Sequence, residues 1–136
     1  MDVSWRYPVH HRVESIAFST DRAFLPASRS YMACIDLQTG QEQWRTKIEN
    51  VWGWLALSPD GVVYLNQHDE LVVLEKDTGR ERWKKKLDGT FGWLHAFADC
   101  VVVGGWRGNT DIQCLDVRTG QRRWIYPARR RSLHRT

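Results

Sequence analysis

Four tryptophans recur along this chain at almost constant intervals, and this repeat constrains the fold more than any other feature. Trp5, Trp44, Trp83 and Trp124 lie 39, 39 and 41 residues apart. Each of the last three ends a shared sequence motif, in which an acidic residue is followed by a Thr-Gly pair and then by the Trp. Repeats of about 40 residues are typical of propeller blades or of paired-helix solenoids. The shared positions are Asp36, Thr39, Gly40 and Trp44; Glu75, Thr78, Gly79 and Trp83; and Asp116, Thr119, Gly120 and Trp124.

The local pattern inside each unit favours strands over helices. Short runs rich in β-branched residues alternate with turns such as Pro59-Asp60-Gly61 and Asp77-Thr78-Gly79. No run keeps a helical period over the roughly 11 residues that an amphipathic helix needs. Four strands in about 40 residues make one propeller blade, so we predict an all-β propeller segment of four-stranded antiparallel blades. In the second unit the expected strands cover residues 54–58, 62–66, 71–75 and 81–86.

The spacing also predicts the domain boundaries. We expect one propeller segment over residues 1–127, followed by a basic and flexible tail over residues 128–136. The third unit is longer than the others by two residues, which fall between Val103 and Asp111. The three expected blades cover about residues 13–48, 52–87 and 91–126.

The repeated phrase resembles the motif of quinoprotein-type, or PQQ-like, β-propellers, which reads roughly A-x-D-x-x-T-G-x-E-x-W. All three copies match the Thr-Gly-x-x-x-Trp core of that motif. Glu75 stands in one copy where the motif has Asp, and the Ala position holds Cys34, Val73 and Cys114. The resemblance covers about residues 3–127.

The resemblance implies a structural role for the repeated Trp. In such propellers the Trp docks between neighbouring blades, close to a Thr-Gly turn, so Trp44, Trp83 and Trp124 are expected to be docking residues. The glycine of each turn is expected to adopt a positive φ, which other residues adopt only at an energetic cost.

The first Trp belongs to a fragment of a unit. Trp5-Arg6-Tyr7-Pro8 has the same pattern as Trp124-Ile125-Tyr126-Pro127, so residues 4–8 are interpreted as a lone outer strand with no blade before it. One outer strand and three blades cannot close a ring, because propellers typically need four to eight blades. We therefore expect that the chain is not a stable free monomer. Either Met1 is a natural start and further blades follow residue 127, or subunits associate head to tail through their end blades.

Charge and cysteine content limit the classes of partner. The net charge of +4 comes entirely from Arg129, Arg130, Arg131 and Arg135, so the propeller segment itself is neutral. Such a tail could contact nucleic acid or anionic lipid, but we favour a frayed terminus and expect no nucleic-acid partner.

The sequence contains no run of about 20 apolar residues that could span a membrane. The three cysteines have no metal-ligand spacing and, with no secretory signal, favour the cytoplasm: Cys34, Cys100 and Cys114.

Residues that could carry chemistry are scattered. Asp21, Asp60 and Asp99 each lie 16 residues after a repeat Trp, one per blade, which is typical of a structural turn residue. The basic outer strand Arg82-Trp83-Lys84-Lys85-Lys86 suggests either nucleic-acid contact or, through its lysines, protection of an outer strand from pairing. No nucleophile motif accompanies the histidines, among which His95 stands out because it replaces an Ala on an expected inner strand. The histidines are His10, His11, His68, His95 and His134.

Two groups of residues suggest binding of a ligand or a protein partner: a set of tryptophans and the inserted loop. Trp52, Trp54 and Trp93 could stack on a flat ligand, but we expect them to fill the taper between blades. The inserted loop is interpreted either as a longer hairpin turn or as a recognition loop. Its candidate contact residues are Trp106, Arg107 and Asn109.

Together these observations favour a non-catalytic propeller scaffold or binding module without catalytic residues, cofactor or metal. Its partner would be another protein, further propeller blades or a second copy of the chain. The alternative is a piece of a PQQ-dependent dehydrogenase, which would bind the quinone and calcium. The chain lacks the adjacent Cys pair that many such enzymes use near the cofactor.

Overall fold

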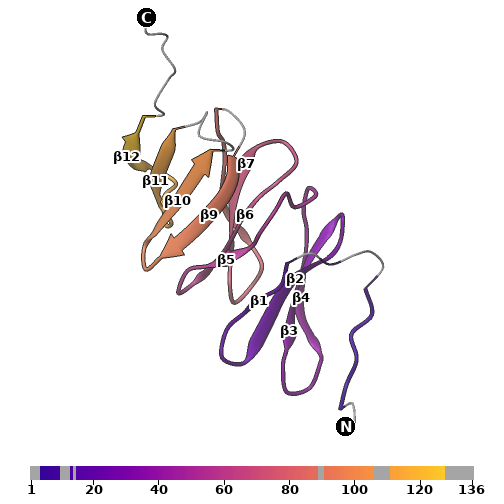
Figure 1. Ribbon diagram of the computed structural model, residues 1–136. Coiled ribbons are helices and arrows are strands. Elements are labelled where there is room, and N and C mark those ends of the chain that lie inside the picture. The colour runs from indigo at the N-terminus through magenta and orange to yellow at the C-terminus, as the bar shows by residue number, and fades with distance from the viewer. Residues whose placement is uncertain (1–3, 10–12, 14, 89–90, 106–110, 128–136) are drawn as a thin grey trace, which may run out of the picture.

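The computed structural model describes residues 4–9, 13, 15–88, 91–105 and 111–127, and these residues form three four-stranded antiparallel sheets. Within each sheet the strands follow one another in chain order, so each sheet is a β-meander (Figure 1). The predicted all-β propeller blades are confirmed. Blade 1 contains β1 (Ala17–Phe18), β2 (Arg22–Ser28), β3 (Tyr31–Asp36) and β4 (Glu42–Lys47). Blade 2 contains β5 (Ala56–Leu57), β6 (Gly61–Leu65), β7 (Glu70–Glu75) and β8 (Glu81–Lys86). Blade 3 contains β9 (Phe91–Phe97), β10 (Cys100–Gly105), β11 (Ile112–Asp116) and β12 (Arg122–Tyr126).

The inner strands of blades 1 and 2 are shorter than the sequence suggests. In blade 2 the expected strand over residues 54–58 shrinks to β5, whose two residues pair with Val63 and Val62 of β6. Before β5 the backbone turns at Gly53, which has φ 89°. The outer strand β8 has the predicted bounds, and β6 and β7 lie within one residue of them.

Packing between blades follows from the alternation of side chains along the strands. We call the face of a blade that packs on the next blade in the chain its forward face, and the opposite face its rear face. The forward face of blade 1 meets the rear face of blade 2 in one buried apolar cluster. The forward face of blade 2 meets the rear face of blade 3 in another. The first cluster includes Phe24, Met32 and Cys34 with Val62, Tyr64, Val72 and Leu74, and the second includes Val63, Leu65, Leu71 and Val73 with Leu94, Val101, Val103, Leu115 and Val117.

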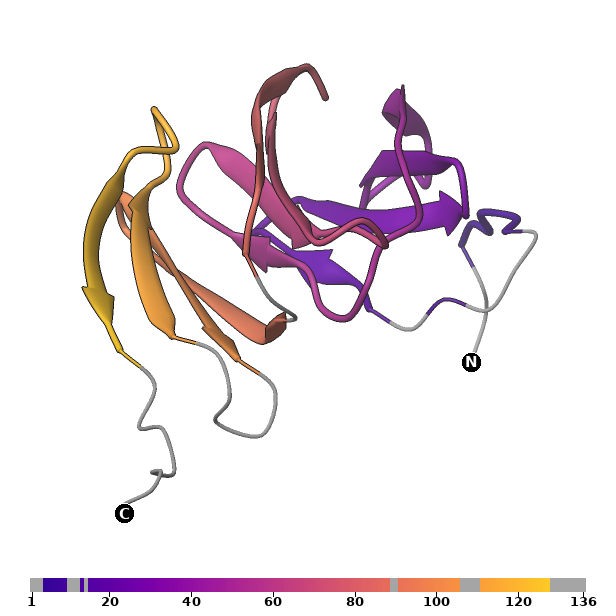
Figure 2. The same ribbon diagram turned by 90° about the horizontal axis from the view of Figure 1, so that it is seen from above.

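Blade 2 is buried on both faces, because it is the one described blade with a neighbour on each side (Figure 2). Every residue of β6 and the four central residues of β7 are buried. Each such Val or Leu contributes about 1.5–3 kcal/mol by leaving water, so this blade carries much of the stability of the array.

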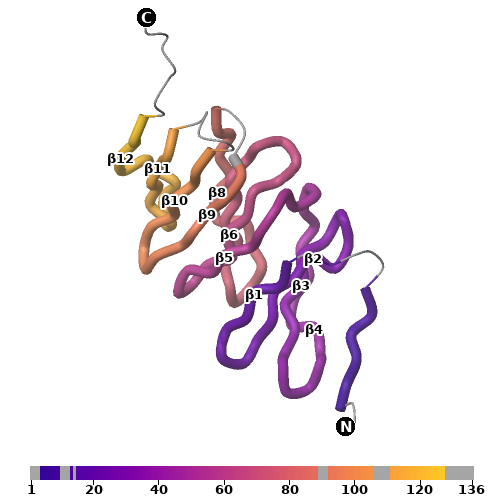
Figure 3. The backbone as a smooth tube through the Cα atoms, viewed as in Figure 1, coloured from indigo at the N-terminus to yellow at the C-terminus, as the bar shows by residue number. Residues whose placement is uncertain are grey.

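The two ends of the array differ. The rear face of blade 1 has no blade behind it, yet Ala23, Leu25, Ala33 and Ile35 are buried. Residues 4–9 run beside this blade, as the indigo trace shows (Figure 3). They belong to no strand, which corrects the prediction of an outer strand over residues 4–8: a strand needs a paired neighbour, and no blade behind blade 1 supplies one.

Candidate functional site

Each Thr-Gly turn is built from the repeated acid, threonine and glycine. In the first turn, the Asp36 carboxylate accepts hydrogen bonds from the backbone N–H groups of Gln38 and Thr39, at 2.8 and 3.0 Å. These bonds, that from Thr39 first, hold the pKa of Asp36 below its usual range. The turn is closed by the Gly40 N–H, which donates to the Asp36 carbonyl at 2.8 Å.

The Trp44 indole of blade 1 lies on the Thr-Gly turn of blade 2. Its Nε1–H donates to the Lys76 carbonyl at 2.8 Å. The ring covers Gly79, which has φ 78°, and the Thr46 hydroxyl donates to the Gly79 carbonyl at 2.6 Å. One strand therefore supplies both an apolar and a polar contact to the next blade.

Trp83 makes the same contact one blade further on. Its Nε1–H donates to the Val117 carbonyl at 2.8 Å, and its ring covers Gly120. Here the ammonium group of Lys85 donates to the Gly120 carbonyl at 3.1 Å. Thr46 and Lys85 occupy the same place in their strands, two residues after the Trp, so this position bonds the next turn in both blades.

The N-terminal Trp5 occupies the remaining Thr-Gly turn. Its Nε1–H donates to the Leu37 carbonyl at 2.8 Å, and its ring covers Gly40. The Tyr7 hydroxyl donates to Glu42 at 2.5 Å, and an Arg45 N–H donates to that hydroxyl at 3.3 Å. Residues 4–9 therefore hold blade 1 as an outer strand of a preceding blade would, without pairing in a sheet.

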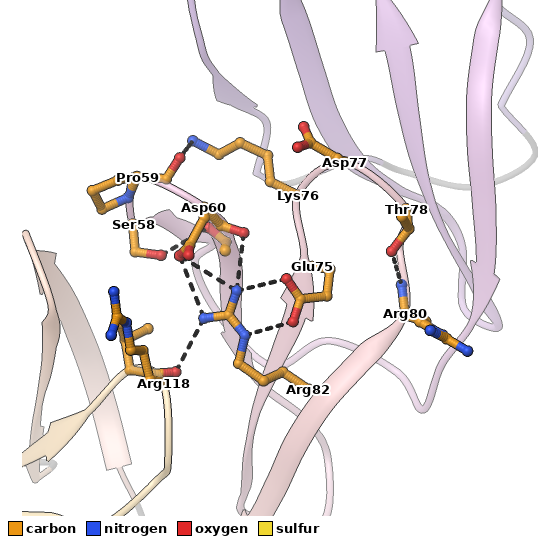
Figure 4. A network of polar contacts seen from close by, with 12 residues as sticks. Ser58, Pro59, Asp60, Glu75, Lys76, Asp77, Thr78, Arg80, Arg82 and Arg118 are labelled. Carbon is orange, nitrogen blue, oxygen red and sulfur yellow. Dashed lines mark hydrogen bonds and ion pairs between the residues drawn. The ribbon is translucent and has the colours of Figure 1, made fainter.

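Arg82, the residue before the repeat Trp83, connects blades 2 and 3 through ion pairs and hydrogen bonds (Figure 4). Arg82 donates to both carboxylate oxygens of Glu75, at 2.8 and 2.7 Å, and reaches Asp60 at 3.3 Å. It also donates to the Val117 carbonyl of blade 3 at 3.3 Å. The Arg82 hydrogen bonds hold the pKa of Glu75 below its usual range.

Arg123 repeats this arrangement in blade 3 with Asp116 at 2.9 Å and Asp99 at 3.1 Å. Blade 1 has Gln43 at this position, and its amide reaches Asp36 at 3.3 Å. The sequence analysis placed Arg82 in a basic outer strand but predicted no ion pair for Arg82 or Arg123, although their place directly before Trp83 and Trp124 was the available signal. They explain why an acid lies at a fixed distance from each of these Trp residues.

The forward face of blade 3 is the open end of the array. Register places His95, Val102, Cys114 and Trp124 across this sheet, just as Ala56, Val63, Val73 and Trp83 lie across blade 2. Trp124 is 48% exposed, and no described carbonyl accepts a hydrogen bond from its indole. The resemblance implied that Trp124 docks on a neighbouring blade, but the described residues include no blade for it to contact.

Three rings stand in a row on the inner strand of this open face. The His95 ring stacks on Phe97, with centroids 6.0 Å apart, and lies 6.2 Å from the Trp93 ring. Trp93 lies so close to Gly104 that a Cβ there would meet its ring at 1.9 Å. His95, the most distinctive of the histidines in the sequence, is therefore part of an aromatic surface.

The inner tryptophans do not fill the taper between blades, which corrects the sequence interpretation. Trp54 is 64% exposed and Trp52 is also exposed, and both precede the two-residue strand β5. Trp93 is partly exposed on the open face. Trp54, Trp93 and His95 help to line an open groove of about 510 Å³ between the inner edges of blades 2 and 3.

The cysteines are free thiols. Cys34 and Cys114 are buried, as predicted, and burial raises the pKa of each to about 11. The neighbouring Cys100 thiol further raises the pKa of Cys114. The sequence did not indicate this proximity, which arises because β10 and β11 are adjacent antiparallel strands.

The remaining candidates do not converge on one site. His68 lies on a hairpin turn, 3.3 Å from Glu49, and Lys86 donates to the His68 carbonyl. Asp21 lies 3.7 Å from Arg22, which also pairs with Asp77 of blade 2 at 3.0 Å. The part of the chain that the structure describes contains no group of three His, Cys, Asp or Glu side chains that could hold a metal ion. The candidates outside the described residues are His10, His11, Trp106, Arg107, Asn109, Arg129, Arg130, Arg131, His134 and Arg135.

Residues 28–135 match a family of PQQ-like repeats described as outer membrane protein assembly factor BamB. No curated protein sequence matches the chain. Within the described residues, no helix is long and apolar enough to cross a membrane.

Solved propellers share the fold at low sequence identity. BamB from Moraxella catarrhalis is 19% identical with a TM-score of 0.75, and the match covers 93% of this chain and 41% of that one. The computationally designed Ika4 protein is 22% identical with a TM-score of 0.73, covering 90% of this chain and 78% of that one. Quinohemoprotein alcohol dehydrogenase from Comamonas testosteroni is 24% identical with a TM-score of 0.66, covering 85% of this chain and 21% of that one.

Proposed function

Because this chain belongs to the PQQ-like repeat family of outer membrane protein assembly factor BamB, we propose that it is a non-catalytic propeller module that binds protein and works within a larger or oligomeric propeller. One fold of this kind hosts many activities, so the proposal rests on the surfaces of this chain. The surface that carries it is the forward face of blade 3.

The residues of this face are equivalent to those that form the interface between blades 2 and 3, but no described blade covers them. Between blades 2 and 3, Val63 and Val73 belong to a buried apolar cluster, and Trp83 packs against it. The matching row on blade 3 leaves Val102 and Trp124 in contact with water, beside the exposed Phe97. Covering apolar surface stabilises by roughly 25 cal/mol per Å², so this face favours a protein partner or another blade over solvent.

Charge supports a protein partner over a nucleic acid. The basic residues of β8 and β12 are largely engaged within the array: Lys85 bonds a backbone carbonyl, and Arg82 and Arg123 are paired with acids. A nucleic-acid site would need free cations gathered on one face.

The test is the mass of the chain in solution as its concentration rises, read by sedimentation or light scattering. We expect association, and we expect Val102→Lys to abolish it by placing a charge in the centre of the open face. Trp52→Lys is the matched control, because Trp52 is exposed outside that face. A wild-type chain that stays a monomer and captures no partner blade or protein would contradict the proposal.

The alternative of a quinone-dependent dehydrogenase has a separate test. Calcium in such enzymes needs several oxygen ligands at one place. Among the described residues, no three His, Cys, Asp or Glu side chains lie together as such a site would favour. Titration with calcium and pyrroloquinoline quinone, followed by Trp fluorescence, would support that alternative only if quenching saturates at a defined stoichiometry.

A further inference from the structure

We propose that the outer strand β12 of one copy of this chain docks on the first Thr-Gly turn of a second copy, where Trp124 replaces that copy's own Trp5. This inference rests on the proposed assembly through end blades and names the residues that carry it. The partner is a second copy of the chain, and the reaction is an exchange of one docked segment for another.

The described residues contain four repeat tryptophans but three Thr-Gly turns, and this mismatch points to a second copy as the partner. Three Thr-Gly turns receive Trp5, Trp44 and Trp83, whose indoles bond the carbonyls of Leu37, Lys76 and Val117. Trp124 is the fourth repeat Trp and has no turn among the described residues. Any turn that it could use in a second copy already holds a Trp.

The first turn is the easiest of the three to vacate. Trp44 and Trp83 extend from paired strands inside the array, whereas Trp5 lies in residues 4–9, which belong to no sheet. Releasing Trp5 therefore breaks its own contacts and those of Tyr7 but no strand ladder. Strand β12 is already ordered by pairing with β11, so its docking has less conformational entropy to lose.

Strand β12 carries the groups that the first turn uses. Trp5-Arg6-Tyr7-Pro8 and Trp124-Ile125-Tyr126-Pro127 place Trp, Tyr and Pro at the same offsets. In the first turn Tyr7 bonds Glu42 and Arg45. Tyr126 is exposed and can offer the same hydroxyl to Glu42 of the second copy.

The two end faces are both apolar but carry different side chains. The inner strand of blade 3 carries Trp93, His95 and Phe97, where blade 1 has Ser15, Ala17 and Ser19. The rear face of blade 1 has both small and large apolar side chains. It has Ala23 and Ala33 at the positions of Val62 and Val72 in blade 2. Phe18, Leu25 and Ile35 lie on the same face, so the rings of blade 3 in a second copy would meet apolar side chains there.

Association of Trp variants tests the exchange, because Trp124 and Trp5 compete for the same Leu37 carbonyl and the same Gly40 surface. Trp124→Ala should remain a monomer at concentrations where the wild type associates. Trp5→Ala should associate at a concentration about tenfold lower, because the turn is vacant from the start. If the wild type associates and Val102→Lys blocks it, but neither Trp variant shifts it, the exchange is wrong while the proposed module stands.

A cross-link gives a second readout that does not depend on the stability of Trp5→Ala. One sample carries Tyr126→Cys and the other carries Glu42→Cys, and the two are mixed and oxidised. We expect a disulfide between copies at these two positions, identified by peptide mass. Arg29→Cys, on the exposed β2–β3 hairpin, replaces Glu42→Cys as the control and should give none. Equal yields from both mixtures would overturn the proposal.

Discussion

The Trp44 indole lies against Gly79 so closely that a Cβ on residue 79 would stand 2.4 Å from its ring. No side chain fits at that distance, and the glycine also has φ 78°. The glycine of the motif is thus required by the turn that it forms and by the ring that it receives from the preceding blade.

Gly79→Ala should destabilise the array by about 2–4 kcal/mol, because it adds a clash with Trp44 to the strain of a positive φ. Gly53→Ala is the matched control. Gly53 has φ 89° but nothing within 4 Å of its would-be Cβ, so this variant should show the strain alone, about 1 kcal/mol. Chemical denaturation measures both. Equal losses would show that the ring contact contributes nothing.

Trp83→Ala should cost about 2–4 kcal/mol, somewhat less than the roughly 3–5 kcal/mol typical of fully buried aromatics, because the Trp83 side chain is only partly buried. Trp124→Ala removes an exposed ring of the same repeat position and should cost less than about 1 kcal/mol in dilute monomer. Thermal melts at low concentration compare the two. An unchanged melting temperature for Trp83→Ala would contradict its docking role.

Arg82→Ala should destabilise the contact between blades 2 and 3, because it leaves Glu75 and Asp60 facing each other without their shared cation. Arg82→Lys should not restore the loss fully, since a lysine cannot bond both oxygens of Glu75 and the Val117 carbonyl at once. Urea denaturation at pH 7 would rank the three proteins. Full recovery by Lys would show that only the charge matters.

The stability of the wild type should fall in acid. Arginine hydrogen bonds lower the pKa of Glu75, Asp99 and Asp116 in the folded chain, so their stabilising effect is present above the unfolded pKa of about 4. It is lost as the pH falls through the lower folded values. Unfolding free energies between pH 6 and pH 2 should therefore decline less steeply for Arg123→Gln than for the wild type. Parallel curves would show that the Asp99 and Asp116 pairings do not contribute.

Cys34 and Cys114 should react slowly with thiol reagents at pH 8, because a pKa of about 11 leaves roughly one thiolate in a thousand. Cys100 is less buried and should be modified first. Labelling followed by mass spectrometry distinguishes the three sites. Rapid modification of Cys34 in the folded chain would contradict its burial between blades 1 and 2.

The repeat predicted the blades because a fixed motif specifies the same turn and strand pattern each time. It missed the exposure of Trp54, since sequence alone does not show that β5 ends after two residues. It also missed the Arg82 and Arg123 pairings, which depend on acids brought together by neighbouring turns. The contact of Trp5 with Gly40 was not anticipated, because residues 4–8 were interpreted as a paired outer strand, whereas Trp5 holds the turn without pairing in a sheet.

The indole of every docking Trp bonds the blade that follows its own strand. A structure held this way behaves as a row of nearest neighbours, in which each unit can open without disturbing units beyond the next. Blade 2 has a neighbour on each side, so its amide protons should exchange most slowly, and those of β1 and β12 fastest. The same independence means that duplicating one unit of about 40 residues would lengthen the row with ready-made contacts, a simple route by which such a fold can grow.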